Sequence, residues 1–196
     1  MEVIAKRAAR ARVFVGVGSN LDPDANVLRA LERLDREAGV TAVSTFYRTP
    51  ALDRPGDPPF VNGVVEVRPL RSALELKRVL NRIEDGLGRR RSGDRYAPRP
   101  IDLDLLLHCE EVSTEPGLIL PHPDLRTRPF VALPVMELAP DLVLPDSGAP
   151  LSVVAAALPP RSMEPLPGLT LELRRRFAHE RHEGGAAGTG TPAGDR

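Results

Sequence analysis

The chain of 196 residues suits one compact domain with short appendages, and no stretch of it reaches the roughly 20 apolar residues of a membrane-spanning helix. Its 27 basic residues balance its 27 acidic residues, so no overall field draws it to nucleic acid or membrane, and its single cysteine excludes an intramolecular disulfide and a cysteine-based zinc cluster. Any basic patch must therefore be local. Because the basic N-terminus lacks the apolar stretch of a secretory signal, we expect a cytoplasmic protein.

The first predicted elements are a strand and a helix. Residues 13–17 form a short apolar run that breaks into a polar turn at 18–20, as a buried strand does at its end. Asp22 then offers a helix N-cap, and Pro23 occupies the first helical position. Apolar residues recur at helical spacing up to Gly39, which supplies the stop.

Two strands and a second helix follow. Residues 40–48 and 60–67 are rich in β-branched and aromatic residues, and a loop rich in proline and glycine separates the two runs. Ser72, with Glu75 three residues later, forms a capping box that starts the second helix. This helix leads into a polar loop at 88–100 with five arginines in thirteen positions.

A fourth strand at 101–108 completes the order strand–helix–strand–strand–helix–strand. This order predicts an α+β fold, specifically a ferredoxin-like sandwich with a mostly antiparallel sheet. Additional short elements are expected, an extended piece at 118–121 and a helix at 129–138.

The domain organisation follows from where these patterns weaken. We expect one domain at residues 12–160, flanked by an N-terminal extension at 1–11 and a C-terminal extension at 161–196. Within the latter, 169–177 could form a short amphipathic element without an assigned partner. The Gly/Ala/Thr-rich end, 183–196, lacks bulky apolar residues and is expected to be disordered.

Asp102 and Asp104 are two carboxylates in an otherwise apolar strand. Residues i and i+2 of a strand point to one face, so both carboxylates emerge together while Ile101, Leu103 and Leu105 face the other way. Two like charges repel and each is costly to desolvate, and a divalent cation removes both penalties. Magnesium is the natural choice, because one or two carboxylates plus phosphates and waters hold it. A solvated acidic face on an edge strand is the alternative that the residues alone leave open.

The loop before these aspartates carries five arginines, namely Arg89, Arg90, Arg91, Arg95 and Arg99. Their planar forks bind phosphate oxygens bidentately, so the loop and the aspartates together suit a magnesium–polyphosphate ligand. A nucleic-acid surface is the rival interpretation, but only Tyr96 offers an aromatic platform there. The chain has no G-x-x-x-x-G-K-[ST] phosphate loop, and its two lysines, Lys6 and Lys77, lie elsewhere. Metal and arginine would therefore hold the phosphates.

Two further polar residues are candidates with open alternatives. His122 is fixed between two prolines and followed by arginines, which fits a phosphate contact, although a lone histidine is more often a structural hydrogen-bonding residue. Asn62 is polar within an apolar strand and needs partners if it is buried. It could equally cap the preceding loop.

Five motifs occur in a fixed order, at Gly18-Ser19-Asn20-Leu21, at Ser44 to Pro50, at Phe60-Val61-Asn62, at Arg99 to Asp104, and at Pro121 to Phe130. In order and spacing they resemble the 6-hydroxymethyl-7,8-dihydropterin pyrophosphokinase family of folate biosynthesis. The resemblance runs from about Val13 to Pro145.

The resemblance implies an ATP-dependent diphosphotransferase. The hydroxyl of 6-hydroxymethyl-7,8-dihydropterin would attack the β-phosphorus of ATP and give AMP and the pterin diphosphate. Asp102 and Asp104 match the family's ligands for two Mg²⁺ ions, and Arg91 and Arg99 join them as catalytic residues. Because the overall charge is balanced, we expect no nucleic-acid or membrane partner, and we expect a monofunctional monomer.

The resemblance also implies two sets of binding residues. The pterin site would comprise Thr49, Pro50, Leu52, Phe60, Asn62 and Phe130, with Asn62 reading the edge of the ring and the two phenylalanines stacking on it. The nucleotide site would comprise Asn81, Glu84, Arg91, Tyr96, Arg99, Leu105, His122 and Arg128.

Three positions depart from the family pattern. Tyr96 stands where tryptophan is common, Gly117 where a basic residue can contact the nucleotide, and Pro123 where some members have an aromatic residue. These departures bear on the affinity for ATP and not on the reaction type. Two rival hypotheses belong to other classes: a non-catalytic ligand-sensing module, which leaves the aspartate pair without a purpose, and a nucleic-acid-binding domain.

Overall fold

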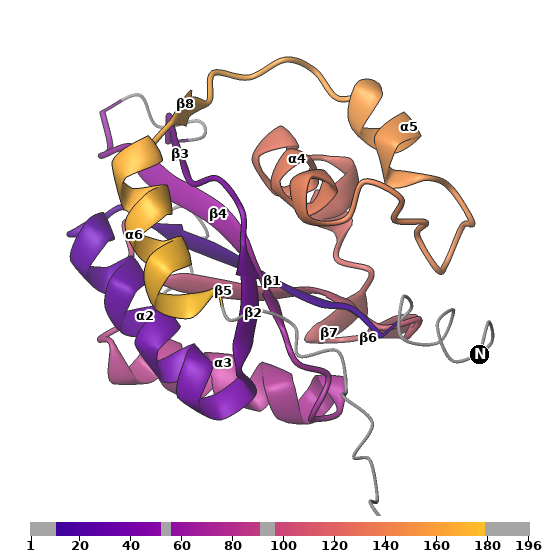
Figure 1. Ribbon diagram of the computed structural model, residues 1–196, viewed down its shortest axis with the longest axis horizontal. Coiled ribbons are helices and arrows are strands. Elements are labelled where there is room, and N and C mark those ends of the chain that lie inside the picture. The colour runs from indigo at the N-terminus through magenta and orange to yellow at the C-terminus, as the bar shows by residue number, and fades with distance from the viewer. Residues whose placement is uncertain (1–10, 52–55, 91–96, 179–196) are drawn as a thin grey trace, which may run out of the picture.

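The computed structural model describes residues 11–51, 56–90 and 97–178 (Figure 1). The expected disorder at 183–196 and nearly all of the expected extension at 1–11 lie outside these ranges. The first half contains β1 (Val13–Ser19), α2 (Pro23–Ala38), β2 (Val40–Val43), β3 (Tyr47–Thr49), β4 (Phe60–Val67) and α3 (Ala73–Gly86). The second half contains β5 (Asp102–His108), β6 (Ser113–Glu115), β7 (Leu118–Leu120), η1 (Pro123–Arg126), α4 (Pro129–Leu138), α5 (Leu151–Ala156), β8 (Glu164–Pro165) and α6 (Pro167–Phe177).

The main sheet has six strands in the order β5-β1-β4-β3-β8, with β2 also paired to β4. Every pair in it is antiparallel. With α2 after β1 and α3 after β4, this is the predicted ferredoxin-like α+β arrangement. A separate two-stranded ribbon, β6-β7, adds the extended piece expected near residue 118 together with a partner strand that was not predicted.

The single strand predicted at 40–48 is wrong in one respect, because it is two strands separated by residues 44–46. At Ser44 the side chain takes the place of a backbone acceptor in the sheet. The backbone N–H of Val64 donates to Ser44 Oγ at 2.9 Å. The next residues then leave the ladder, and Phe46 turns its side chain into the core, where it is fully buried. A side chain that bonds to backbone competes with regular pairing in this way.

The two long helices begin in different ways. The capping box predicted for α3 is confirmed, because Ser72 Oγ accepts from the N–H of Glu75 while the Glu75 carboxylate accepts from the N–H of Ser72. For α2 the predicted start is confirmed, with Asp22 at the N-cap position and Pro23 first in the helix, but the Asp22 side chain makes no capping hydrogen bond. Instead, Asn26 Nδ2 donates to the carbonyl of Leu21 at 2.7 Å and secures the first turn.

One face of the sheet is covered by α2, α3 and α6, and the other by α4, α5 and η1 (Figure 1). The first layer packs on alternate strand residues such as Val15, Val65 and Leu103, and its core includes Leu173 and Phe177 of α6. The C-terminal segment after residue 160 therefore adds a helix to the main core. None of the helices in the described parts of the chain is both long and apolar enough to cross a membrane.

The second layer covers only part of its face. Phe14, Val64 and Leu106 pack beneath α4 and α5. Further along the same strands, the face carries glycines, an asparagine and the two aspartates in place of large apolar residues. The functional candidates therefore lie where the covering layer ends.

Candidate active site

A pocket of about 530 Å³ opens on the uncovered part of this sheet face. It brings together most of the residues predicted to form the two binding sites, namely Thr49, Pro50, Phe60, Asn62, Arg99, Asp102, Asp104, His122, Arg128 and Phe130. They come from β3, β4, β5 and α4 and from the loops beside these strands and on either side of η1. Its size is that of a pocket for a small molecule or cofactor.

The floor of the pocket contains two glycines of β1. Gly18 pairs with Asp102 on one side and Asn62 on the other, and Gly16 pairs with Asp104. A Cβ added at Gly18 would lie 2.9 Å from Asn62 Oδ1, so only glycine leaves room beside that amide. Sequence reasoning missed this role, although the spacing of the two glycines places them on one strand face with Phe14.

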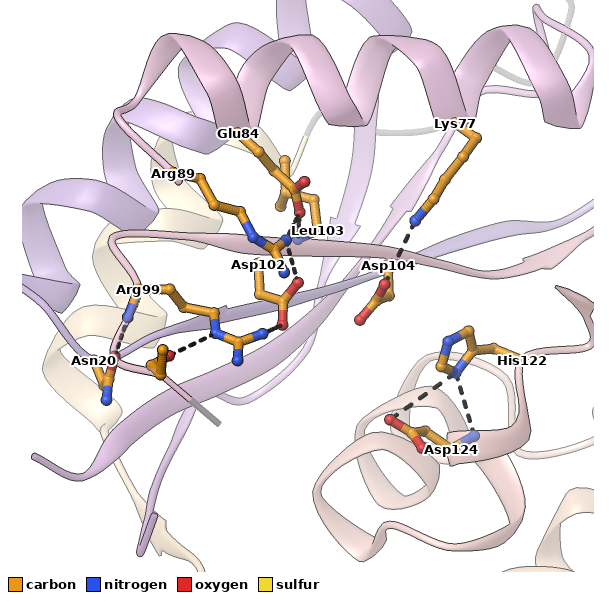
Figure 2. Close-up of polar contacts among 11 residues, drawn as sticks. Asn20, Lys77, Glu84, Arg89, Arg99, Asp102, Leu103, Asp104, His122 and Asp124 are labelled. Atoms are coloured by element: carbon orange, nitrogen blue, oxygen red, sulfur yellow. Dashed lines mark hydrogen bonds and ion pairs between the residues drawn. The ribbon is translucent and has the colours of Figure 1, made fainter. Parts of the chain in front are cut away.

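Asp102 and Asp104 point to the same face of β5, as predicted (Figure 2). Asp102 accepts from two guanidinium groups: Arg89 Nη1 lies 2.5 Å from Oδ1, and Arg99 Nη1 lies 2.7 Å from Oδ2. Among the described residues, Asp104 has one ionic partner, at a longer distance: Lys77 Nζ of α3 lies 3.5 Å from Oδ1. The pair is therefore asymmetric, because Asp102 is neutralised within the protein and Asp104 much less so.

Glu84 lies behind the pocket wall and holds Arg89 in place. Its carboxylate is almost fully buried, accepts from the N–H of Leu103 at 2.7 Å and forms an ion pair with Arg89. Burial raises the pKa of Glu84, and the nearby charge of Asp102 acts in the same direction. Burial alone would lower the pKa of Arg89, but Asp102 and Glu84 outweigh it and raise that pKa. Arg89 therefore remains a cation between two carboxylates.

Arg99 is positioned through its backbone as well as its side chain. Its N–H donates to Asn20 Oδ1 at 2.7 Å, and its Nε donates to the carbonyl of Ala97 at 3.2 Å. Asn20 is buried, and its Nδ2 donates to the carbonyl of Pro58 at 3.3 Å. Asn20 thus ties the arginine loop to the loop that precedes β4, a contribution that sequence reasoning did not assign to it.

The opposite wall comes from η1 and α4. His122 Nδ1 accepts from the N–H of Asp124 at 3.2 Å (Figure 2). In a neutral imidazole with this contact the proton is on Nε2. Arg128 Nε lies 3.8 Å from Asp124 Oδ1, which places a cation on the same wall. Phe130 lines the pocket beside them. Asp124 was not among the residues selected from the sequence. Its contacts with His122 and Arg128 depend on the turn at η1, which no local pattern revealed.

Asn62 is held by a side chain of the neighbouring strand. Its Nδ2 donates to Thr49 Oγ1 at 2.8 Å, and Thr49 is almost fully buried. This bond fixes the plane of the amide and leaves the carbonyl oxygen directed toward Gly18. The sequence left open whether Asn62 caps the preceding loop. The contact seen here joins two strands and is not a loop cap.

Some predicted residues lie elsewhere. The Leu105 side chain is on the opposite face of β5, in the core beneath α3, and Asn81 of α3 does not line the pocket. Glu84 is also outside the lining but touches it through Arg89. The predicted residues Leu52, Arg91 and Tyr96 lie outside the described residues.

The carboxylates of the pocket suit magnesium better than a metal with an all-protein ligand set. Among the described residues, no group of three or more His, Cys, Asp or Glu side chains could hold a metal ion. Two same-face carboxylates beside several arginines match an ion that draws its remaining ligands from water and phosphate. Burial and the charge of Asp102 raise the pKa of Asp104, so its charged form is unfavourable where no cation is bound.

We expect Asp104→Asn to stabilise the ligand-free protein at neutral pH. Burial and the charge of Asp102 raise the Asp104 pKa above its ordinary value of 3.8, despite Lys77. Stability is therefore lost as the pH rises from the unfolded pKa through the folded one, because the native state binds the proton more tightly. The variant should melt above the wild type at about pH 7, with a smaller difference near pH 4. A lower melting temperature at neutral pH would contradict this.

Comparisons with known proteins agree with this geometry. The profile of the 7,8-dihydro-6-hydroxymethylpterin-pyrophosphokinase family matches residues 14–140. A Pseudomonas aeruginosa protein named 2-amino-4-hydroxy-6-hydroxymethyldihydropteridine pyrophosphokinase is 41% identical over 160 residues, which cover 80% of this chain and 98% of that protein. A Haemophilus influenzae protein of the same name is 37% identical over 138 residues, covering 68% and 85%. This chain therefore belongs to the 7,8-dihydro-6-hydroxymethylpterin-pyrophosphokinase family.

Proposed function

We propose that this protein transfers diphosphate from ATP to 6-hydroxymethyl-7,8-dihydropterin, giving AMP and the pterin diphosphate for folate biosynthesis. Membership of the family and the names of its relatives support this reaction. The observation that carries it is the pocket itself, which places the Asp102–Asp104 pair and its arginines on the same floor as Asn62. A site for charged phosphates thereby adjoins a site for a polar ring.

The pterin would occupy the part of the pocket around Asn62. The Asn62 amide offers a carbonyl and an N–H in one plane, which suits the alternating donors and acceptors at the edge of a pterin. Phe60 and Phe130 reach the pocket from β4 and α4 and supply aromatic surface for stacking. Thr49 and Pro50 complete this side, and we retain Leu52 as a proposed contributor.

The nucleotide phosphates would lie over Asp102 and Asp104. Magnesium bound there would neutralise phosphate charge, and we propose two such ions. Arg99, His122 and Arg128 surround the same space and can donate to phosphate oxygens. Arg91, Tyr96 and Asn81 remain proposed nucleotide contacts, and Arg91 a proposed catalytic residue. Any nucleotide contact of Leu105 would come from its backbone, because its side chain is in the core. Glu84 would act through Arg89, since it is bonded to that guanidinium and to the backbone of β5.

The reaction needs little covalent help from the protein. The pterin hydroxyl oxygen forms a bond to the β-phosphorus while the bond from that phosphorus to the oxygen shared with the α-phosphate breaks, and the hydroxyl proton is released. Because charge shifts to the departing AMP, fixed cations and a closed geometry lower the barrier. The carboxylates of Glu84 and Asp102 hold the Arg89 guanidinium in place, so it is one such fixed cation. A monomeric state and a cytoplasmic location complete the proposal.

The identity of the nucleotide product tests this function. We expect the purified protein to release AMP from ATP only when both magnesium and 6-hydroxymethyl-7,8-dihydropterin are present, as separated nucleotides on an ion-exchange column would show. ADP as the product would indicate transfer of a single phosphoryl group and would contradict the proposal. Binding of either ligand without turnover would favour a ligand-sensing module instead.

A further inference from the structure

The C-terminal segment contacts the strand that carries Thr49. In Figure 1 the chain passes from α5 to β8 and then into α6, which lies beside α2 and β2. β8 pairs with β3, the three-residue strand that ends at Thr49. The match to the family profile ends at residue 140, before this segment begins.

Both backbone groups of Phe46 are bonded to this segment. The N–H of Phe46 donates to Thr170 Oγ1 at 3.0 Å in a buried contact, and its carbonyl accepts from the N–H of Leu166 at 2.9 Å. Phe46 lies in the bend between β2 and β3, immediately before the first residue of β3. The start of β3 is therefore fixed by the C-terminal segment and not by the sheet alone.

A second contact holds the same bend. Arg174 Nε donates to the carbonyl of Val43 at 3.0 Å, and its Nη2 forms an ion pair with Glu137 at 2.5 Å. Glu137, on α4, accepts from the N–H of Thr45 at 2.9 Å. Residues from α4 and α6, on opposite layers of the fold, thus meet at the bend defined by residues 44–46.

The bend leads directly to the pterin amide. The Phe46 ring packs on the backbone of Gly63, where an added Cβ would lie 2.6 Å from ring atoms, and Gly63 follows Asn62 in β4. Tyr47 pairs with Asn62 in the sheet. Two residues later, Thr49 Oγ1 accepts from Asn62 Nδ2. A displacement of the bend would therefore move both groups that set the position of Asn62.

We propose that α6 is a positioning element for pterin recognition, acting through Thr170 and Arg174 on the bend at 44–46 and from there on Thr49 and Asn62. This inference rests on the proposed function for the identity of the ligand. It does not involve the phosphate side of the pocket, where Asp102 and Asp104 are paired with Arg99 and Lys77 from other elements. The loss of these α6 contacts should weaken pterin binding and spare ATP binding.

The test compares Thr170→Val with Thr170→Ser in the full-length chain. Valine keeps the shape of threonine but leaves the buried N–H of Phe46 without an acceptor, whereas serine retains the hydroxyl. We expect valine to raise the KM for the pterin about 5-fold or more, with the KM for ATP and kcat within about 3-fold of wild type. Serine should restore the pterin KM. An equal rise in both KM values, or no rescue by serine, would overturn the proposal.

Arg174→Gln, with Arg175→Gln as its matched control, gives an independent variant if Thr170→Val folds poorly. Arg175 follows Arg174 on α6 but is exposed, so both changes remove one charge from the same helix. Only Arg174→Gln should raise the pterin KM. If Arg174→Gln and Arg175→Gln have equal pterin KM values, the ion pair to Glu137 does not position the site, and the proposal fails.

A spectroscopic readout separates this proposal from the proposed function. In nitrogen-edited NMR spectra of the ligand-free chain, Thr170→Val should shift the side-chain NH₂ signals of Asn62, since its bond to Thr49 is disturbed. The Arg175→Gln control should leave those signals in place. Unmoved Asn62 signals in the valine variant would overturn the positioning role. Absence of pterin-dependent AMP release by the wild type would instead overturn the proposed function.

Discussion

Replacing Asp102 or Asp104 by asparagine should reduce kcat by about 1,000-fold or more while leaving the fold intact. Both carboxylates line the pocket from one face of β5, and no third carboxylate, histidine or cysteine among the described residues could form a metal-binding group with them. An amide oxygen is neutral and a weaker ligand for magnesium than a carboxylate. Steady-state AMP release at saturating magnesium measures the loss.

The two variants should differ in stability, which separates this prediction from a general structural effect. Asp102→Asn leaves Arg89 and Arg99 without their shared carboxylate and should destabilise the protein, because a partly buried cation loses its partner. Asp104→Asn relieves a repelled carboxylate and should stabilise it. Asp85→Asn, at an exposed position of α3, is the matched control and should change neither property. Either pocket variant retaining more than about a tenth of wild-type kcat would contradict the metal assignment.

Arg99→Ala should lower kcat by about 100- to 10,000-fold, with a smaller effect on the KM for the pterin. Arg99 lines the pocket, and its backbone and side chain are both held, by Asn20 and Asp102, so its charge is fixed before ATP binds. A donor that is positioned in advance stabilises the charge that develops on the phosphates without reorganising. Single-turnover measurement of AMP formation isolates the chemical step.

Two comparisons sharpen the Arg99 prediction. Arg99→Lys retains the charge but cannot form a two-pronged contact, so it should recover only part of the lost rate. Arg82→Ala removes an exposed arginine of α3 that does not line the pocket, and it should behave as wild type. If Arg82→Ala and Arg99→Ala reduced kcat equally, the effect would come from net charge and not from the position of Arg99.

The parts of the site that follow strand or helix geometry could be predicted from the sequence. The same-face orientation of Asp102 and Asp104 needs only the alternation of a strand, and the capping box of Ser72 and Glu75 needs only local spacing. The roles assigned to Asn62 and Phe130 came from the family resemblance. The pocket brings those two residues together, but their contact with pterin remains a prediction.

The parts that depend on distant contacts could not be predicted. Lys77 is far from the arginine loop and the aspartates in the sequence, so it was not assigned to the phosphate site. In the structure α3 packs on β5 and brings Lys77 Nζ to 3.5 Å from Asp104. Arg89 was one of five arginines, and only the buried carboxylate of Glu84 singles it out. The backbone N–H of Phe46, in the break between β2 and β3, is bonded to Thr170, which is 124 residues away in the chain. No local pattern contains these contacts.

The most direct test of the central claim counts metal ions at the aspartate pair. Manganese, used in place of magnesium and followed by its paramagnetic resonance signal, should bind the wild type tightly only when a non-hydrolysable ATP analogue is present, because two carboxylates alone hold such ions weakly. We predict two bound ions per chain with the analogue, and fewer in both Asp102→Asn and Asp104→Asn. Unchanged manganese binding in the two variants would contradict the assignment of the metal site to this pair.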